Sequence, residues 1–319
     1  MAVTDRSIIE NASTTFREIA AEVFTDKPPG EWSNWTDLRQ TDSKIVEHDV
    51  LEEMPVVREW AGAKQFHDVQ AAKATLEIKT YEASFAIKRK DLITDRTGMT
   101  ARRMRAWLGD TAYIYDKLSH EALVANGTCY DGTALYSGSH PRGPAGATQS
   151  NTSTTALSHA QFEAVMAAGS SLRFLSGEPI GISYNVLRVG PKLAGLAREI
   201  TGSNERVIAV ANDGLEAGTR VAAATGPNFR GVQVFDGGSV RVIVDPRLVG
   251  TYDDYYYFFD TTRGASALVG YELRGPEPIS LDSMDDDARF HRDEFLYSIE
   301  CDVVFGPGAW QVTYAGIVS

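Results

Sequence analysis

The sequence predicts an α+β fold with long protruding elements at its N-terminal end. Apolar residues recur at helical spacing over 98–126, whereas apolar and polar residues alternate as in strands over 55–90. From residue 158 onward, helical and strand-like segments are mixed, without an internal repeat or a long linker. A chain of 319 residues is long enough to form one large or two intermediate domains.

The first 54 residues are predicted to form an arm. An amphipathic helix is expected over 4–24, and Pro28-Pro29-Gly30 ends its pattern. The apolar positions of this helix are Ile9, Ala12, Phe16, Ile19 and Val23. Residues 25–54 are expected to be irregular and to expose Trp32 and Trp35, which favours contacts with a neighbouring chain.

Residues 55–90 are predicted to form an extended hairpin. Leu76 and Ile78 alternate with polar residues, as do the positions from Tyr81 to Ile87, and the phase changes between Thr80 and Tyr81. Such a change indicates a bulge or a bend. A two-stranded ribbon is barely stable alone, so this hairpin is expected to lie on another surface.

The clearest helix is predicted over 98–126. Its apolar stripe consists of Met104, Leu108, Tyr115, Leu118, Ala122 and Ala125. The pair Asn126-Gly127 provides an end signal. A single helix of this length would extend about 40 Å, with Gly109 as a point at which it could bend.

The rest of the chain is predicted to mix short strands and helices. Helices are expected over 158–170, capped by Ser158, and over 191–200, beginning at Pro191. Strands are expected over 185–189, 206–211, 231–235 and 240–244. Residues 297–305 and 310–314 alternate around Gly306-Pro307-Gly308, which predicts a final hairpin.

Composition excludes several classes of protein. The net charge is −12, from 43 acidic and 31 basic residues, which is the wrong sign for a protein that wraps nucleic acid. An acidic wall would suit a container that repels DNA. Cys129 and Cys301 are too few for a disulfide framework, and we expect reduced thiols. No apolar stretch reaches the roughly 20 residues of a membrane span, and the N-terminus lacks a secretory pattern.

Searches for catalytic and cofactor motifs favour ordinary structural roles. The segment from Gly306 has Gln311 in place of the third glycine of a dinucleotide fingerprint. His120-Glu121 lacks the second histidine of a zinc-protease helix, because Val124 occupies that position. No Gly-x-Ser-x-Gly elbow exists, and the six histidines are scattered. We therefore predict no catalytic, cofactor-binding or metal-binding residues.

Three charged or aromatic clusters also have structural interpretations. The acidic run 282–287 fails as a calcium loop at its ligand, glycine and glutamate positions. The aromatic run 252–259 has no neighbouring Lys or Arg, which favours a buried strand or a subunit contact over base stacking. The basic clusters 88–90 and 102–105 are expected to form salt bridges with a neighbouring subunit, with DNA or an acidic scaffold as alternatives.

Several strings, taken in order, resemble the major head subunit of Mu-like phages and prophages. They are Pro55–Trp60 (PVVREW), Tyr81–Asp91 (YEASFAIKRKD), Tyr130–Ser137 (YDGTALYS) with His140-Pro141, Ala156–Ser158, Gly177–Pro179 and Leu187–Pro191 (LRVGP). The similarity runs from about residue 50 to residue 250 and more loosely to the end. That family is similar to tailed-phage capsid proteins of the Hong Kong 97 type.

The resemblance implies five regions. These are an N-terminal arm (1–54), an extended hairpin loop (55–90), a peripheral domain (91–186) with a spine helix (98–126), an axial domain (187–285), and return strands of the peripheral domain (286–319). Some relatives carry a long N-terminal scaffolding region, whereas this chain reaches the arm within about 50 residues, so a separate scaffold protein is implied. Lys64, Lys73 and Lys79 lie in the ribbon without a motif that would transfer the cross-linking chemistry known for the fold.

The resemblance also implies a function. The chain would be a major capsid protein, not an enzyme, that self-assembles into the icosahedral head shell around the double-stranded DNA of a tailed phage. Its partners would be itself in hexamers and pentamers, a scaffold protein, a maturation protease, a portal, a decoration protein and non-specifically bound DNA, with no membrane. It would reside in the virion capsid after assembly in the host bacterial cytoplasm.

The residues predicted to contact neighbouring subunits are Trp32, Trp35, Trp60, Tyr81, Phe85 and Ile87. Two other functions remain open at this point. An encapsulin-like nanocompartment shell protein would share the fold but enclose enzymes. A hydrolase with an unrecognised triad would turn over ester or amide substrates as a monomer or dimer.

Overall fold

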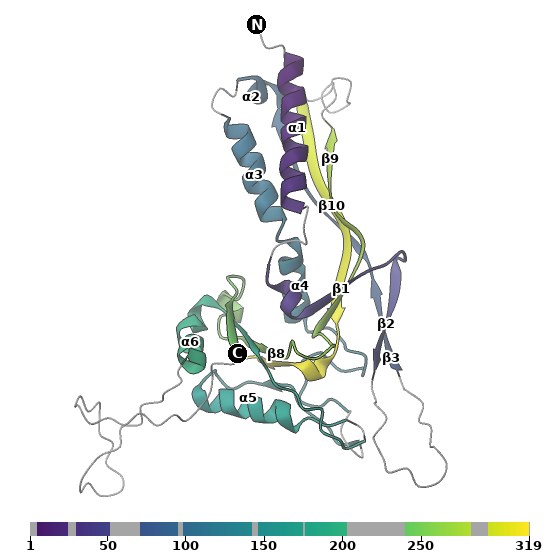
Figure 1. The fold of residues 1–319 in the computed structure, drawn as a ribbon, viewed down its shortest axis with the longest axis vertical. Coiled ribbons are helices and arrows are strands. Elements are labelled where there is room, and N and C mark those ends of the chain that lie inside the picture. Colours follow the sequence, from purple (N-terminus) through teal and green to yellow (C-terminus); the bar gives the residue numbers. More distant parts are fainter. Residues whose placement is uncertain are drawn as a thin grey trace, which may run out of the picture. The chain divides into compact units, whose positions relative to one another are not determined.

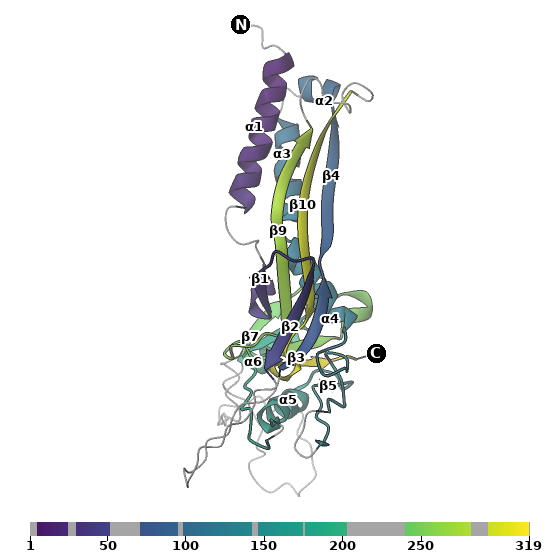
Figure 2. The ribbon, with the colours of Figure 1, turned by 90° about the vertical axis from the view of Figure 1, so that its right-hand side faces the viewer.

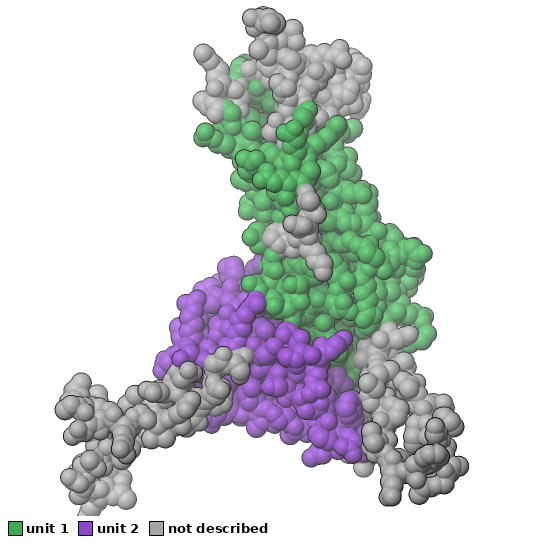
Figure 3. Space-filling model, in the orientation of Figure 1, with its two compact units in different colours: residues 1–135, 265–310 green, residues 136–264, 311–319 purple. Residues whose placement is uncertain are grey.

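The computed structural model describes residues 5–24, 30–51, 71–94, 98–141, 146–174, 176–202, 240–281 and 293–318 (Figure 1). The chain forms two compact units (Figure 3). Unit 1 consists of residues 1–135 and 265–310, and unit 2 of residues 136–264 and 311–319. Each unit therefore combines two separate stretches of chain.

Unit 1 is built on a long four-stranded sheet (Figure 2). Its strand order is β1 (Thr36–Gln40), β9 (Leu268–Leu281), β10 (Glu294–Pro307) and β4 (Lys79–Lys88). Strand β1 is parallel to β9, and the other two pairings are antiparallel. A separate antiparallel ribbon joins β2 (Ile45–Leu51) to β3 (Ala71–Glu77).

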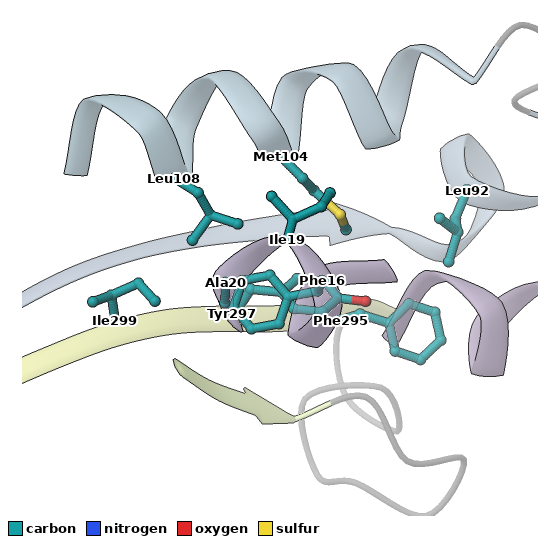
Figure 4. Packing of buried hydrophobic residues seen from close by; sticks show 9 residues of the cluster. All are labelled: Phe16, Ile19, Ala20, Leu92, Met104, Leu108, Phe295, Tyr297 and Ile299. Carbon is teal, nitrogen blue, oxygen red and sulfur yellow. The ribbon is translucent and has the colours of Figure 1, made fainter. Parts of the chain in front are cut away.

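Two helices pack on one face of this sheet, α1 (Asp5–Phe24) and α3 (Met99–Thr111). Alternate residues of the strands point toward them, because successive strand side chains lie on opposite faces. The resulting core cluster is shown in Figure 4 and comprises Phe16, Ile19, Ala20, Leu92, Met104, Leu108, Phe295, Tyr297 and Ile299. Leu92 comes from the short helix α2 (Arg89–Thr94).

A second cluster of unit 1 surrounds α4 (Ile114–Ala125) and the 3₁₀ turn η1 (Trp32–Asn34). The Trp32 ring meets the Tyr115 ring edge-on at a centroid distance of 5.4 Å. The Trp32 backbone N–H also donates to Asp116 Oδ1 at 2.8 Å. This bond fixes the turn to the first turn of α4.

Unit 2 contains a five-stranded sheet. Its order is β5 (Thr152–Ser153), β11 (Thr313–Gly316), β8 (Tyr256–Phe259), β6 (Val186–Val189) and β7 (Arg241–Val244). All residues of β6, β8 and β11 are buried. The other elements are α5 (His159–Ser171), η3 (Pro191–Leu193), α6 (Ala194–Gly202) and η5 (Gly250–Tyr252), and η6 (Trp310–Val312) precedes β11.

Several predicted elements are confirmed. Helix α5 follows Ser158, whose hydroxyl accepts a hydrogen bond from the backbone N–H of Gln161. The helix expected over 191–200 is η3 followed by α6, and the strands at 185–189 and 240–244 are β6 and β7. The aromatic run contains the buried strand β8. The strands predicted over 206–211 and 231–235 lie outside the described residues.

The single helix predicted over 98–126 is wrong, since α3 ends at Thr111 and α4 begins at Ile114. The break does not fall at Gly109. Met104 and Leu108 of α3 belong to the cluster around Phe16, whereas α4 packs its apolar residues in the cluster around Trp32. One straight helix would have to pack against both clusters. The turn at 112–113 lets α3 face the cluster around Phe16 and α4 face the cluster around Trp32.

The hairpin predicted over 55–90 is also differently built. The ribbon pairs β2 with β3, whereas 79–88 pairs with β10 in the long sheet. Residues 25–54 are not irregular throughout, because they contain η1, β1 and β2. The unit boundaries differ from those expected at residues 186 and 285, and the assignment of arm, hairpin, peripheral and axial regions stays a prediction.

The predicted C-terminal hairpin is wrong. Strand β10 continues through Gly306 to Pro307 and pairs with β4 and β9, while β11 pairs with β8 and β5. The glycine at 308 serves a close approach instead of a hairpin turn, since a Cβ there would collide with the carbonyl oxygen of Ser266.

Candidate assembly surfaces

Two of the predicted contact residues lie inside unit 1. Trp32 is 2% exposed and Trp35 is 3% exposed, so the expectation of exposed aromatic side chains in this stretch is wrong. Trp32 packs on Tyr115, and the surrounding cluster includes Leu118 and Val303. A contact of these two residues with a neighbouring subunit stays a prediction.

Three other predicted residues lie on the helix-facing side of β4. Tyr81, Phe85 and Ile87 are half-buried. The Phe85 ring meets Trp107 at 4.6 Å and stacks on Tyr297 at 5.3 Å. Burial also raises the pKa of the Tyr81 phenol. These side chains thus support the fold of their own unit; Trp60 lies outside the described residues.

The opposite face of the long sheet is exposed and acidic where β4, β10 and the second half of β9 lie side by side. Glu82, Glu300 and Glu277 lie side by side across β4, β10 and β9. The Arg274 guanidinium pairs with Glu300 at 3.2 Å and with Asp302 at 3.1 Å. Ile279 and Leu281 on β9 are 38% and 49% exposed. Like charges on adjacent strands destabilise a sheet, so this face is not optimised for an isolated subunit.

The helical side of unit 1 carries a basic cluster on α3. Arg102, Arg103 and Arg105 are exposed on α3. Arg105 reaches Glu22 of α1 at 3.3 Å, so part of this basic cluster is used within the subunit. The helical side also exposes Glu18 and Glu22 of α1, so charges of both signs lie on it.

A buried cation in unit 2 was missed by sequence reasoning. Arg188 is 0% exposed, forms an ion pair with Asp245, and places its guanidinium carbon 5.4 Å from the centre of the Tyr257 ring. The aromatic run thus has a basic partner from another strand. Because Arg188 and the aromatic residues of β8 are buried, they do not form a base-stacking platform. The only sequence signal was an arginine inside the apolar run Val186–Val189.

The histidine and cysteine side chains that could act as catalysts or metal ligands have structural roles. His140 is buried, and its Nε2 lies 3.1 Å from Asn151 Oδ1. Burial raises the pKa of both the Cys129 and Cys301 thiols to about 12, so neither is a thiolate at neutral pH. Within the described ranges, no three His, Cys, Asp or Glu side chains gather as they would around a metal ion. Across the same ranges no helix is long and apolar enough to span a membrane.

One cavity of about 530 Å³ lies within unit 1. Trp32, Tyr115 and Glu272 line it, together with residues of β1 and β9. Glu272 is buried and accepts hydrogen bonds from the Tyr115 hydroxyl and from the Gln40 amide. Burial, together with the hydrogen bond to the Glu272 carboxylate, raises the pKa of Tyr115. The carboxylate is therefore engaged in holding α4, β1 and β9 together.

Solved structures with a similar fold include chains from phage capsids. A chain from the procapsid of bacteriophage JBD30 is 18% identical, with a TM-score of 0.54 over 98% of this chain and 75% of that chain. A chain from Microbacterium phage Oxtober96 is 12% identical, with a TM-score of 0.53 over 92% of this chain and 92% of that chain. A chain from the capsid of Cyanophage P-SCSP1u is 11% identical, with a TM-score of 0.52 over 91% of this chain and 88% of that chain. No curated relative matches the sequence significantly.

The fold thus defines the class: it is that of the capsid proteins of tailed phages. The family model for the Mu-like prophage major head subunit gpT matches residues 9–162 and 233–317. The chain belongs to this family, and it is a major capsid protein. It is a structural protein of the virion capsid that assembles with copies of itself.

Proposed function

We propose that this protein forms hexamers and pentamers that close into the icosahedral head shell around the double-stranded DNA of a tailed phage. The family match over most of the chain carries this proposal. The open, acidic sheet face of unit 1 supports it, because a large unused surface suits a subunit that is completed by its neighbours. No enzymatic activity forms part of the proposal.

The ribbon of β2 and β3 is proposed as the extended loop that reaches an adjacent subunit. The two strands of the ribbon already pack on their own sheet, where His48 Nδ1 lies 2.9 Å from the Tyr271 hydroxyl, so the family relationship supports this part of the proposal. The six predicted contact residues are retained as proposals in this context. Permanent interfaces commonly bury about 2,000–5,000 Å², so many modest contacts would share the load of packed DNA.

The other partners are proposed from the family relationship. They are a separate scaffold protein, a maturation protease, a portal and a decoration protein, with assembly in the host bacterial cytoplasm. Packaged DNA would be held without sequence preference. The net charge of −12 supports weak contact with DNA, because like charges keep the duplex from adhering to the wall.

Negative-stain microscopy of the purified protein, expressed with and without its neighbouring genes, tests this function. Closed shells, hexamers or tubes are the expected result. A stable monomer or dimer under every condition would contradict it, and particles filled with an enzyme cargo would favour a cellular nanocompartment. Replacing Phe85 and Ile87 with Asp is a poor test of assembly, because both side chains pack against the core of unit 1.

A further inference from the structure

The outer edge of β4 has hydrogen-bonding capacity that the described chain does not use. Strand β4 is the last strand of its sheet, and among the described residues it pairs with β10 alone (Figure 2). The other edge of any such strand presents a row of backbone N–H and C=O groups. The pairing with β10 runs over ten residues without a register shift, so this edge is long and regular.

The sequence of β4 does little to protect that edge. Soluble proteins protect exposed edges with short strands, charged side chains, proline, bulges or inward-pointing charges. Strand β4 contains neither proline nor glycine, and residues 83–87 (ASFAI) carry no charge. The charged residues that flank this stretch are Glu82 and Lys88, both exposed on the face away from the helices. The edge is therefore suited to receive another strand.

The positions of these two charges select a partner and a register. Consider two antiparallel copies of β4 related by a two-fold axis perpendicular to the sheet. Their helix-facing side chains lie on the same face of the joined sheet only when one residue of β4 lies opposite the same residue of the second copy. We call this the residue at the axis. With the axis at Phe85, Lys88 of each copy lies opposite Glu82 of the other, and two ion pairs form. With the axis at Ser84, Lys88 lies opposite Thr80 and Glu82 opposite Ala86, so no ion pair forms.

The same register also matches the other side chains. Phe85 would meet its symmetry mate on the helix-facing side, where it already stacks on Tyr297. Ser84 would lie opposite Ala86, two small residues that leave room for the strands to approach. A contact between identical patches is self-complementary, as two-fold interfaces require.

We propose that β4 pairs antiparallel with β4 of a second copy, about a two-fold axis at Phe85, and so joins two four-stranded sheets edge to edge. This inference rests on the proposed function, in which copies assemble into a shell. Edge pairing extends the sheet within its own layer, which suits a wall one subunit thick. Backbone hydrogen bonds provide the attraction, and the Glu82–Lys88 pairs set the register.

Disulfide trapping in assembled particles tests the register. Directly opposite residues of antiparallel strands have Cα atoms about 4.5–5.5 Å apart, within the range of a disulfide. We expect Ser84→Cys and Ala86→Cys variants, mixed before assembly and then oxidised, to give cross-linked dimers. Each variant alone should give none, because its cysteines would be diagonal neighbours about 7–8 Å apart. The native cysteines are buried and serve as an internal control.

Two results would overturn the proposal. One is normal particles without dimers in the mixture, which would leave the shell function intact and remove this interface. The other is equal cross-linking of Ser84→Cys alone, which would place the axis at Ser84. Failure of the unmodified protein to assemble at all would instead count against the proposed function.

Charge reversal gives an independent measurement. E82K or K88E alone should lower the yield of particles several-fold, because each places like charges opposite one another at both symmetric positions. The double variant E82K/K88E should restore the yield. Within one subunit Glu82 already faces Glu300, so E82K should not destabilise the unassembled chain. Equal yields from all variants, or no recovery in the double variant, would contradict the proposal.

Discussion

The Asp245 carboxylate binds both the buried Arg188 guanidinium and the backbone of Arg247. The Arg188 Nε donates to Asp245 Oδ2 at 3.1 Å, while Asp245 Oδ1 accepts the backbone N–H of Arg247 at 2.8 Å. Loss of Asp245 leaves a charge buried without its carboxylate, whereas loss of Arg188 leaves a carboxylate that still has Arg247 beside it. The two residues of one ion pair should therefore differ in their contribution to stability.

We expect Asp245→Ala to lower the free energy of unfolding by about 3–5 kcal/mol, the usual cost of stranding a buried charge. Arg188→Met should cost clearly less, because it removes the buried cation and keeps an apolar stem of similar length. Urea denaturation of unassembled subunits measures both. Equal losses for the two variants would show that the pair acts as one indivisible unit.

The Cys129 and Cys301 thiols are predicted to react slowly in the folded subunit. Burial raises the pKa of Cys129 and of Cys301 to about 12, so few thiolates exist at pH 8. A thiol reagent such as DTNB should therefore react slowly with the native protein and promptly with two thiols per chain in denaturant. Rapid reaction of the native protein would mean that the surrounding packing opens readily.

At the scale of elements, α3 carries an avoidable weakness at Gly109. A Cβ at this position would meet nothing within 4 Å. We expect Gly109→Ala to stabilise the subunit by about 0.5–1 kcal/mol, because glycine loses more backbone freedom on forming a helix. Gly190→Ala is the contrasting variant, since its Cβ would collide with the carbonyl oxygen of Leu248. A thermal melt should move upward for the first variant and downward for the second.

Helix α1 is predicted to depend strongly on Phe16. Phe16 is completely buried, and its ring lies 4.8 Å from that of Tyr297. Phe16→Ala should cost about 3–5 kcal/mol and increase hydrogen exchange along α1. The neighbouring Arg17→Ala is a matched control, because that side chain is exposed and makes one long bond of 3.4 Å to Ser280. Unchanged exchange in Phe16→Ala would show that α1 is held elsewhere.

Sequence periodicity predicted local structure better than it predicted partners. Helix α5 was predictable because Ser158 and the following apolar spacing are local signals. The alternation from Tyr81 to Ile87 correctly indicated a strand with one buried face, but it did not indicate that the partner is β10, more than 200 residues away. The C-terminal hairpin failed for the same reason, since alternation in 297–305 and 310–314 fits any antiparallel neighbour.

The candidate surfaces were predictable only in part. The chemical class of the proposed contacts, aromatic and charged side chains near β4, was visible in the sequence. Which side chains remain free was not, because burial of Trp32 and Trp35 depends on the packing of Tyr115 and its neighbours. The use of Glu82 and Lys88 as a pair emerges only once β4 is known to be an edge strand.

At the scale of the whole molecule, stability should fall at alkaline pH. The pKa values of Cys129 and Cys301 rise from 9.0 to about 12, and that of Tyr256 rises from 10.0 to about 12. Between pH 9 and pH 12 the unfolded chain releases protons that the native chain retains, so unfolding becomes more favourable as pH rises. We expect the melting temperature of the subunit to be level from pH 7 to pH 9 and lower at pH 11. A level profile through pH 11 would contradict these directions.

The division of unit 1 into two distant stretches of chain has a consequence during synthesis. Thr80 on β4 bonds Asp302 on β10, which is 222 residues further along. At about 5–20 residues per second, a ribosome needs about 10–45 s to make the strand that completes the sheet. Until then β4 lacks β10, its only sheet partner among the described residues. Unit 1 can therefore complete its sheet only after nearly the whole chain has been made.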